Sequence, residues 1–165
     1  MALLIKNYNG VLGHFLGDGI LAFFGAPEQM SMRGQAFNAV AMGLAMQHRM
    51  KKLGIKWRNE GLDHSIEIRM GIAQDFVTVG NFGSETYMDY TVIGSGVNLA
   101  SRLENSARPG KILVNYAVYS QTRDDFPYEQ LQEKQIKGFA RPVKVYELDP
   151  EQATDIHPPK PPDYH

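Results

Sequence analysis

Residues 11–24 of the 165-residue chain read VLGHFLGDGILAFF. Two short apolar runs flank a Gly-Asp-Gly sequence at residues 17–19. Glycine on both sides of an aspartate permits the unusual backbone angles that a tight hairpin turn needs. We therefore predict an antiparallel hairpin with Asp18 at its tip.

A helical pattern follows this hairpin. Apolar residues recur at spacings of three and four from about Ser31 to Leu53, which predicts one long amphipathic helix. Residues 66–72 then alternate between apolar and other side chains, as a half-buried strand does. Polar residues over 56–64 and a glycine-rich stretch over 80–86 favour loops.

Strand and helix signals alternate through the second half of the chain. This mixture of hairpins and strand–helix–strand units predicts an α+β fold, with one mixed, mostly antiparallel sheet and helices packed on one face. We expect one domain over residues 1–149 and a proline-rich flexible tail over 150–165. The expected elements are strands over 90–93, 111–114, 128–137 and 143–148, and helices over 94–103 and 116–123.

The composition is that of an ordinary globular domain. Hydrophobic residues make up 43% and charged residues 21% of the chain, which argues against disorder and fibrous repeats. The chain has no cysteine, which excludes disulfide scaffolds, thiolate zinc sites and cysteine nucleophiles. Lys and Arg number 17 and Asp and Glu 18, for a net charge of −1. This balance argues against bulk electrostatic binding to nucleic acid or anionic lipid.

Membrane insertion is also not expected within the chain. No apolar run approaches the roughly 18–20 residues that a membrane helix needs, and the first residues lack the pattern of a signal peptide. We expect a cytoplasmic location, for a free domain or for the cytosolic part of a larger membrane or multidomain protein. No nucleic-acid partner is expected.

Asp18 is the first candidate for chemistry. The glycines beside it leave the backbone open to close approach by a ligand. Its carboxylate is the kind of hard oxygen ligand that Mg²⁺ takes at nucleotide sites. Ordinary turn chemistry also explains the same three residues, so the spacing alone leaves both interpretations open.

Asn98 and Arg102 form a second candidate. They are four residues apart on a predicted helix and therefore share one face. An arginine fork beside an amide suits an anionic, polar substrate. The alternative is a solvated helix face on which Arg102 pairs with Glu104 or another carboxylate. The glycines at 94 and 96 are half of a phosphate-loop pattern, which is too little to stand alone.

Two further residues have weaker signals. Lys137 lies near a predicted turn, where its charge could reach a phosphate, although a simply exposed lysine is the alternative. His14 has no second histidine at metal-ligand spacing, so a core or interface histidine is the default interpretation. The absence of a Gly-x-Ser-x-Gly sequence argues against a serine hydrolase.

Six segments, taken together and in order, resemble one protein family: the class III nucleotidyl cyclase catalytic domain, in its bacterial adenylate cyclase form. The match runs from residue 1 to about residue 148 and leaves out only the proline-rich tail. The segments are FLGDGILAFFGAP (15–27), RMGI (69–72), GNFGS (80–84), MDYTVIG (88–94), VNLASRLE (97–104) and IKG (136–138).

The resemblance implies a ferredoxin-like α+β fold and an activity in intracellular signalling. The family converts ATP to cyclic AMP and pyrophosphate, or GTP to cyclic GMP. Two catalytic domains pair head to tail as a homodimer and build the active sites between them. Two metal ions, Mg²⁺ or Mn²⁺, are held by two aspartates, of which one matches Asp18. Asn98 and Arg102 match the catalytic residues that orient the ribose and steady the transition state, and Lys137 matches a phosphate-binding lysine; these three would come from the partner subunit.

The sequence departs from the family in two respects. It begins inside what resembles the family's N-terminal helical segment, so the first strand, with the other metal-binding aspartate, has no counterpart here. We expect catalysis only together with such a strand. Base recognition in the adenylate cyclases uses a lysine and an aspartate or threonine. Thr91 matches the second, which favours ATP over GTP, whereas His14 occupies the lysine position and favours neither base.

Two functions therefore remain open. The first is a nucleotidyl cyclase, making cyclic AMP in preference to cyclic GMP. The second is a catalytically silent module of the same fold that binds nucleotide or pairs with an active partner. Retention of Asp18, Asn98, Arg102 and Lys137 favours the enzyme, and the missing aspartate favours the silent module.

Overall fold

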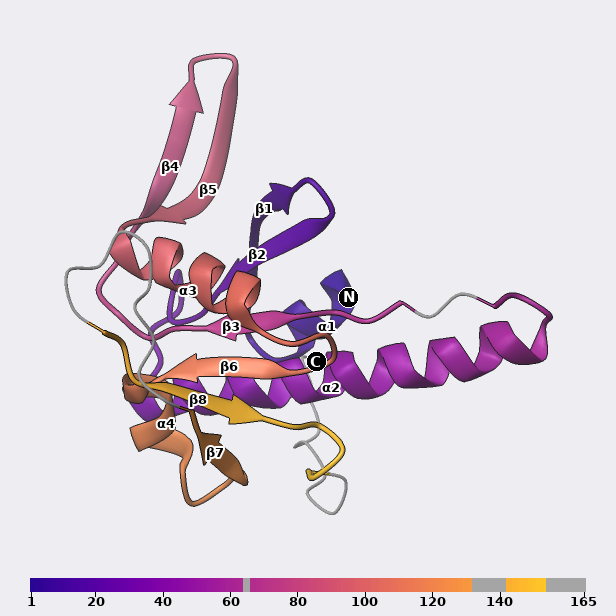
Figure 1. Ribbon diagram of the computed structural model, residues 1–165. Coiled ribbons are helices and arrows are strands. Elements are labelled where there is room, and N and C mark those ends of the chain that lie inside the picture. The colour runs from indigo at the N-terminus through magenta and orange to yellow at the C-terminus, as the bar shows by residue number, and fades with distance from the viewer. Residues whose placement is uncertain (64–65, 132–141, 154–165) are drawn as a thin grey trace.

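Helices and strands alternate in the computed structural model, which describes residues 1–63, 66–131 and 142–153 (Figure 1). Among these residues, none of the helices combines the length and the apolar character that crossing a bilayer requires. The elements are α1 (Ala2–Asn7), β1 (Val11–Leu16), β2 (Gly19–Phe23), α2 (Met32–Asn59), β3 (Met70–Ile72), β4 (Thr78–Ser84), β5 (Tyr87–Ile93), α3 (Ser95–Ser106), β6 (Ile112–Asn115), α4 (Tyr116–Thr122), β7 (Tyr128–Gln130) and β8 (Val145–Leu148).

The centre of the fold is a four-stranded sheet in the order β3-β6-β8-β7. β3 and β6 run parallel, while β8 is antiparallel to both β6 and β7. Every residue of β6 and of β8 is buried, as expected of inner strands covered on both faces. The α+β class and the mostly antiparallel pairing are thus confirmed.

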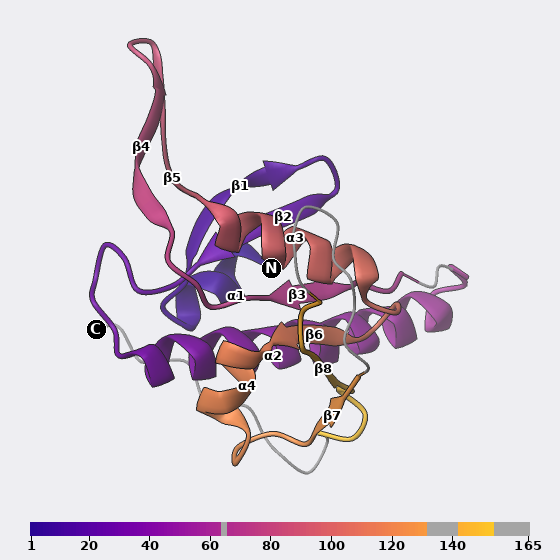
Figure 2. The same ribbon diagram turned by 60° about the vertical axis from the view of Figure 1, so that its left-hand side comes forward.

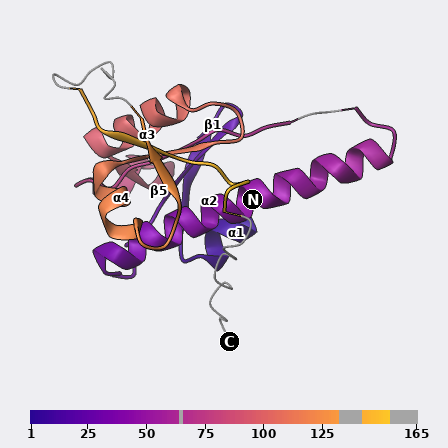
Figure 3. The same ribbon diagram turned by 60° about the horizontal axis from the view of Figure 1, so that its bottom comes forward.

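The helices lie on both faces of this sheet rather than on one. Side chains alternate along β6: Ile112 and Val114 join the larger core with α1, α2 and α4, whereas Leu113 joins a smaller core with α3. Figure 3 shows α3 and α2 on opposite sides of the strands. The expectation of one covered face differs from the structure because β6 and β8 are apolar on both sides, which requires a helix against each.

β3 is held closely between two helices. A Cβ atom added to Gly43 of α2 would lie 3.2 Å from Sδ of Met70 and 3.6 Å from Cδ1 of Ile72, so α2 packs against one face of the strand. On the other face, a Cβ atom on Gly71 would collide with the backbone of Ala100 in α3. The absence of a side chain at Gly71 therefore lets α3 approach the sheet.

Replacing Gly71 with alanine is expected to lower the free energy of unfolding by about 3 kcal/mol, the upper end of what overpacking costs. The new methyl group meets backbone atoms, which cannot move aside as a flexible side chain can. Gly54→Ala is the matched control, because a Cβ atom there meets nothing within 4 Å and alanine favours the helix. Chemical denaturation of both variants checks this; equal stabilities would contradict the packing described.

Two hairpins extend from the sheet beside α3 (Figures 1 and 2). β1 pairs with β2, and β4 pairs with β5 along their whole lengths. The hairpin predicted around Asp18 is thus confirmed. The two hairpins are in contact through β1 and β5, and β5 leads directly into α3.

Several expected boundaries differ from the structure. α2 continues to Asn59, because the helix tolerates Gly54 and no proline interrupts it before the positive-φ Gly61. The strand expected over 66–72 is confined to Met70–Ile72, where a partner strand is present. The loop expected over 80–86 is mostly strand, since backbone pairing within the long hairpin does not require apolar side chains.

The end of the chain is described only in part. Ala153 is buried in the larger core, and Lys111 Nζ lies 2.8 Å from Asp149 Oδ2 just before it. Hydrogen bonding to Lys111 lowers the pKa of the Asp149 carboxyl from its ordinary value. Most of the expected proline-rich tail and the segment that contains Lys137 lie outside the described residues.

Candidate functional site

Asp18 stands at the tip of the first hairpin. Leu16 pairs with Gly19, so only Gly17 and Asp18 form the turn. Gly17 has a φ of 62°, which glycine adopts without strain, and a Cβ atom built there would meet nothing within 4 Å. Asp18 is exposed, and among the described residues its carboxylate has no hydrogen bond or ion pair. The turn therefore presents a solvated carboxylate with open space beside it.

The chain offers a divalent metal one carboxylate at this turn. No group of three or more His, Asp or Glu side chains that could hold a metal occurs within residues 1–63, 66–131 and 142–153. Mg²⁺ at nucleotide sites is commonly held by one or two carboxylates together with phosphate oxygens. The Asp18 carboxylate fits that pattern as one contributor.

His14 and Thr91 are brought together from distant parts of the sequence. Nδ1 of His14 lies 3.1 Å from Oγ1 of Thr91, joining β1 to β5. A bulge at Gly13 allows this approach: the β1–β2 register shifts between Leu12 and His14. A Cβ atom on Gly13 would lie only 3.0 Å from the Thr91 hydroxyl.

This hydrogen bond sets which group His14 offers to a ligand. Thr91 is buried and His14 is half-buried. If Nδ1 accepts from the Thr91 hydroxyl, Nε2 carries the proton and is a donor; if Nδ1 donates, Nε2 is an acceptor. Within the part of the chain that the structure describes, Nε2 has no hydrogen-bond partner. In this pair, Nε2 of His14 is therefore the polar atom that is presented to a ligand at the edge of the hairpin.

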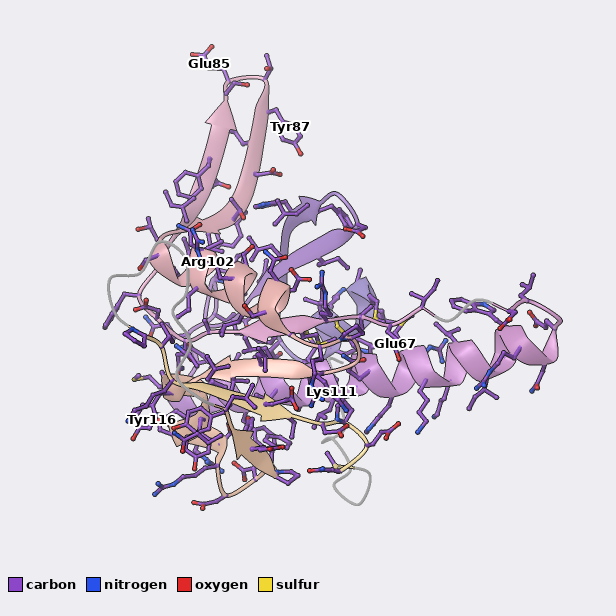
Figure 4. All side chains as sticks on the ribbon, viewed as in Figure 1. Glu67, Glu85, Tyr87, Arg102, Lys111 and Tyr116 are labelled. Carbon is purple, nitrogen blue, oxygen red and sulfur yellow. The ribbon has the colours of Figure 1, made fainter. Side chains whose placement is uncertain are left out.

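Asn98 and Arg102 share the outer face of α3. Leu99 and Leu103 of the same helix point into the smaller core, so Asn98 is exposed and Arg102 half-buried. Figure 4 labels Arg102 on this helix. The two polar side chains thus face away from the sheet.

Among the described residues, Arg102 does not form the ion pair that was the alternative explanation for it. Glu104 instead pairs with Arg69 of the segment before β3, at 3.5 Å. Among residues 1–63, 66–131 and 142–153, no carboxylate lies within ion-pair distance of Arg102. Its guanidinium is accordingly available to an anion.

The start of α3 explains the two glycines at 94 and 96. Gly94 caps the helix with a φ of 138°, and a Cβ atom on Gly96 would lie 3.0 Å from Cβ of Asp75. Asp75 accepts hydrogen bonds from the Phe76 amide at 2.7 Å and from the Ser95 hydroxyl at 3.5 Å. The glycines therefore serve close packing against residues 75–77 here. Sequence reasoning missed Asp75.

The structure leaves the candidates in two groups. His14, Thr91 and Asp18 belong to the hairpins, whereas Asn98 and Arg102 lie on α3. No hydrogen bond or ion pair between described residues joins the two groups. Lys137 lies outside the described residues.

Large apolar side chains are exposed around both hairpins. Phe76 is 96% exposed, and Tyr87, at the far end of the β4–β5 hairpin (Figure 4), is 68% exposed. Monomeric soluble proteins rarely expose large apolar patches, so this surface is suited to contact with another protein chain. The others on the hairpins and the loop before β4 are Phe15, Leu16, Ile20, Val77, Met88 and Ile93.

Among the known proteins that this chain resembles in sequence are nucleotide cyclases. The sequence model of the family described as adenylate and guanylate cyclase catalytic domain matches residues 4–150. Adenylate cyclase 1 of Rhizobium meliloti (strain 1021) is 29% identical over 147 residues, which cover 88% of this chain and 22% of that protein. The terminal-differentiation-specific adenylate cyclase of Dictyostelium discoideum is 28% identical over 149 residues, covering 87% and 7%. The chain thus spans less than a quarter of these relatives.

Solved structures are similar over most of the chain. The adenylyl cyclase CyaB from P. aeruginosa is 42% identical, with a TM-score of 0.85, covering 89% of this chain and 75% of that one. The guanylyl cyclase Cya2 is 32% identical, with a TM-score of 0.78, covering 89% and 73%. The guanylate cyclase domain of RhGC from Catenaria anguillulae, solved with GTP, is 25% identical, with a TM-score of 0.76, covering 88% and 75%.

Proposed function

The chain belongs to the adenylate and guanylate cyclase catalytic domain family, and we propose that it converts ATP to cyclic AMP and pyrophosphate. The 3′-hydroxyl oxygen of ATP attacks the α-phosphorus, the bond to the bridging oxygen of pyrophosphate breaks, and the hydroxyl proton is lost. The observation that carries this proposal is the pairing of His14 with Thr91, at the two positions that the resemblance assigns to the base. We take residues 1–149 as the cyclase domain, in the cytoplasm.

Base recognition falls to His14 and Thr91. Adenine presents an acceptor at N1 and a donor at N6, whereas guanine presents a donor at N1 and an acceptor at O6. In this proposal Thr91 donates to Nδ1 of His14, which places the proton on Nε2, and Nε2 then donates to adenine N1. This tautomer would leave the N1 proton of guanine facing another donor, whereas the opposite tautomer would accept that proton. The choice of ATP therefore rests on Thr91 acting as the donor.

The transition state needs positive charge beside the α-phosphate. Arg102 supplies it as a fixed guanidinium that no described carboxylate neutralises. Asn98, one turn earlier on the same face, orients the ribose through its amide. Lys137 contacts the terminal phosphates in this proposal. These groups hold the nucleotide so that the 3′-hydroxyl and the leaving pyrophosphate lie in line.

Asp18 holds a divalent cation together with the phosphates. When bound, Mg²⁺ or Mn²⁺ lowers the pKa of the attacking hydroxyl and neutralises charge that develops at phosphorus. The open, solvated turn at Asp18 gives a metal–nucleotide complex unobstructed access. The complete site is proposed to hold two ions, the second with ligands from outside the described residues.

Two copies of the domain are proposed to pair head to tail. The metal-binding turn and the outer face of α3 are not joined within one chain, so the site is completed when the hairpins of one copy face α3 of the other. The exposed Phe76 and the apolar side chains of both hairpins supply the surface that such a pairing would bury.

A silent nucleotide-binding module is the second candidate. The observation that favours it is the single carboxylate at the hairpin turn, with no three-ligand cluster among the described residues. Incubating the full-length protein with ATP or GTP and Mn²⁺ separates the two. Formation of cyclic AMP and pyrophosphate in equal amounts supports the enzyme, whereas nucleotide binding without either product supports the silent module.

Replacing His14 with lysine is expected to raise the preference for ATP over GTP by about tenfold. Lysine only donates hydrogen bonds, so it matches adenine N1 and opposes the N1 proton of guanine. The ratio of kcat/KM for the two nucleotides measures this. His48→Lys is the control, since His48 lies on α2 away from the hairpins. An unchanged ratio in the His14 variant would mean that this side chain does not contact the base.

A further inference from the structure

The distal part of α2 projects beyond the sheet, with only the segment that leads to β3 running back alongside it (Figures 1 and 3). The buried residues of α2 all lie between Ala36 and Gln47. The helix nevertheless continues to Asn59, so its last three turns contribute no buried side chain to the hydrophobic core. A projecting helix of this kind calls for an explanation other than packing.

Charge is concentrated on these turns. Five of the chain's 17 Lys and Arg residues lie within residues 49–58, and none of its 18 Asp and Glu residues do. The near-neutral net charge of the whole chain conceals this local excess. The five cations are Arg49, Lys51, Lys52, Lys56 and Arg58.

Three of these cations form one line. Arg49, Lys52 and Lys56 are spaced by three and four residues, which places them on a single face of the helix; we call them the basic stripe. All three are exposed. Of the five cations, only Lys51 has an ion pair among the described residues, with Glu151 at 3.9 Å. The basic stripe therefore presents its charge to solvent.

Apolar side chains are also exposed at the projecting end. Ile55, which directly precedes Lys56 and follows Lys52 by three residues, is 45% exposed, and Leu62, just beyond the helix, is 47% exposed. Ile66 instead lines a cleft with Gly54 and Arg58, on a different face of α2. Trp57, on the last turn, is half-buried.

We propose that the projecting end of α2 is a docking surface for an anionic lipid bilayer. The basic stripe would lie against acidic headgroups, while Ile55 and Leu62 enter the boundary between headgroups and acyl chains. Interfacial helices combine these two features. A nucleic acid would use the cations but has no place for the apolar side chains, and so it is disfavoured.

The chain contains one tryptophan, Trp57, so intrinsic fluorescence reports on the proposed contact directly. Vesicles of phosphatidylcholine with about 30% phosphatidylglycerol are expected to shift its emission to shorter wavelength and to sediment the protein. Pure phosphatidylcholine vesicles are expected to do neither, since each basic residue contributes about a fivefold gain only on an anionic surface. Salt at about 0.5 M is expected to weaken binding, because it screens exposed charges.

Charge reversal of the basic stripe tests the assignment. Arg49→Glu, Lys52→Glu and Lys56→Glu together are expected to lower vesicle partition more than a hundredfold. The control reverses three exposed cations elsewhere, Lys6, Arg123 and Lys144, and changes the net charge equally; it is expected to retain most of the binding. Equal losses in the two variants, or binding retained in the stripe variant, would overturn the proposal.

The apolar part has its own test. Ile55→Ser with Leu62→Ser is expected to reduce the wavelength shift and weaken partition with all cations in place. A single-stranded oligonucleotide serves as the competing anion. If it binds as tightly as the anionic vesicles and the serine variant binds both unchanged, the surface is a nucleic-acid site and the lipid assignment is wrong. Cyclase activity in solution plays no part in these measurements, so they stand apart from the proposed reaction.

Discussion

Arg102→Ala in the full-length protein is expected to lower kcat for cyclic-nucleotide formation by about 10²–10³, the usual effect of losing one preorganised charge at a transition state. The loss falls on kcat more than on KM, because the guanidinium is proposed to act where charge develops during the reaction. Arg102 is half-buried on the outer face of α3 and has no ion pair among the described residues. Its removal should therefore leave the fold intact.

Ser101→Ala is the matched control for this substitution. Ser101 is the exposed neighbour of Arg102 on the same helix, and its variant is expected to retain the parent rate. Steady-state rates with ATP and Mn²⁺, together with thermal unfolding of both variants, provide the comparison. A kcat within about threefold of the parent in Arg102→Ala would remove this residue from the catalytic group.

Asp18→Asn is expected to abolish most metal-dependent turnover and to weaken binding of the Mn²⁺–ATP complex. Asparagine keeps the shape of the side chain and is compatible with the turn beside Gly17, but it removes the negative charge that holds a divalent ion. Calorimetric titration with ATP, with and without Mn²⁺, measures the change. The expected result is nucleotide binding that no longer strengthens when the metal is added.

A second hairpin turn supplies the control for Asp18. Glu85 is an exposed carboxylate at the tip of the β4–β5 hairpin (Figure 4), and Glu85→Gln removes one charge from the same kind of structure. That variant is expected to show the metal dependence of the parent. If Asp18→Asn shows it as well, the carboxylate does not bind the metal and the Gly-Asp-Gly sequence is turn chemistry alone.

Features that depend on local chemistry were predictable from the sequence. The first hairpin follows from glycines at the turn, and α3 follows from apolar spacing after Gly94. Strand boundaries that depend on a neighbouring strand were not predictable from the sequence. β3 is limited to the residues that face β6, and residues 80–84 are strand because β5 lies opposite them. Pairing of this kind is invisible to periodicity within a single segment.

The candidate site likewise combines features that were predictable from the sequence with features that were not. Asn98 and Arg102 share a face because helix geometry requires it. The contact of His14 with Thr91 joins residues 77 positions apart, and no pattern in either segment indicates it; the resemblance to a family pointed to both. The bulge at Gly13 that permits the contact is a tertiary feature. The role of Asp75 at the start of α3 likewise depends on two segments meeting in space.

We propose that each active site is shared between two copies of the domain, and mixing two inactive variants is the sharpest test of this arrangement. Asp18→Asn damages the hairpin side of a site, and Arg102→Ala damages the α3 side. In a heterodimer of the two, one site carries both changes and the other carries neither. We expect activity to return on mixing, at up to about half the parent value per heterodimer. A mixture that stays inactive while labelled subunits are shown to exchange would mean that the site lies within one chain.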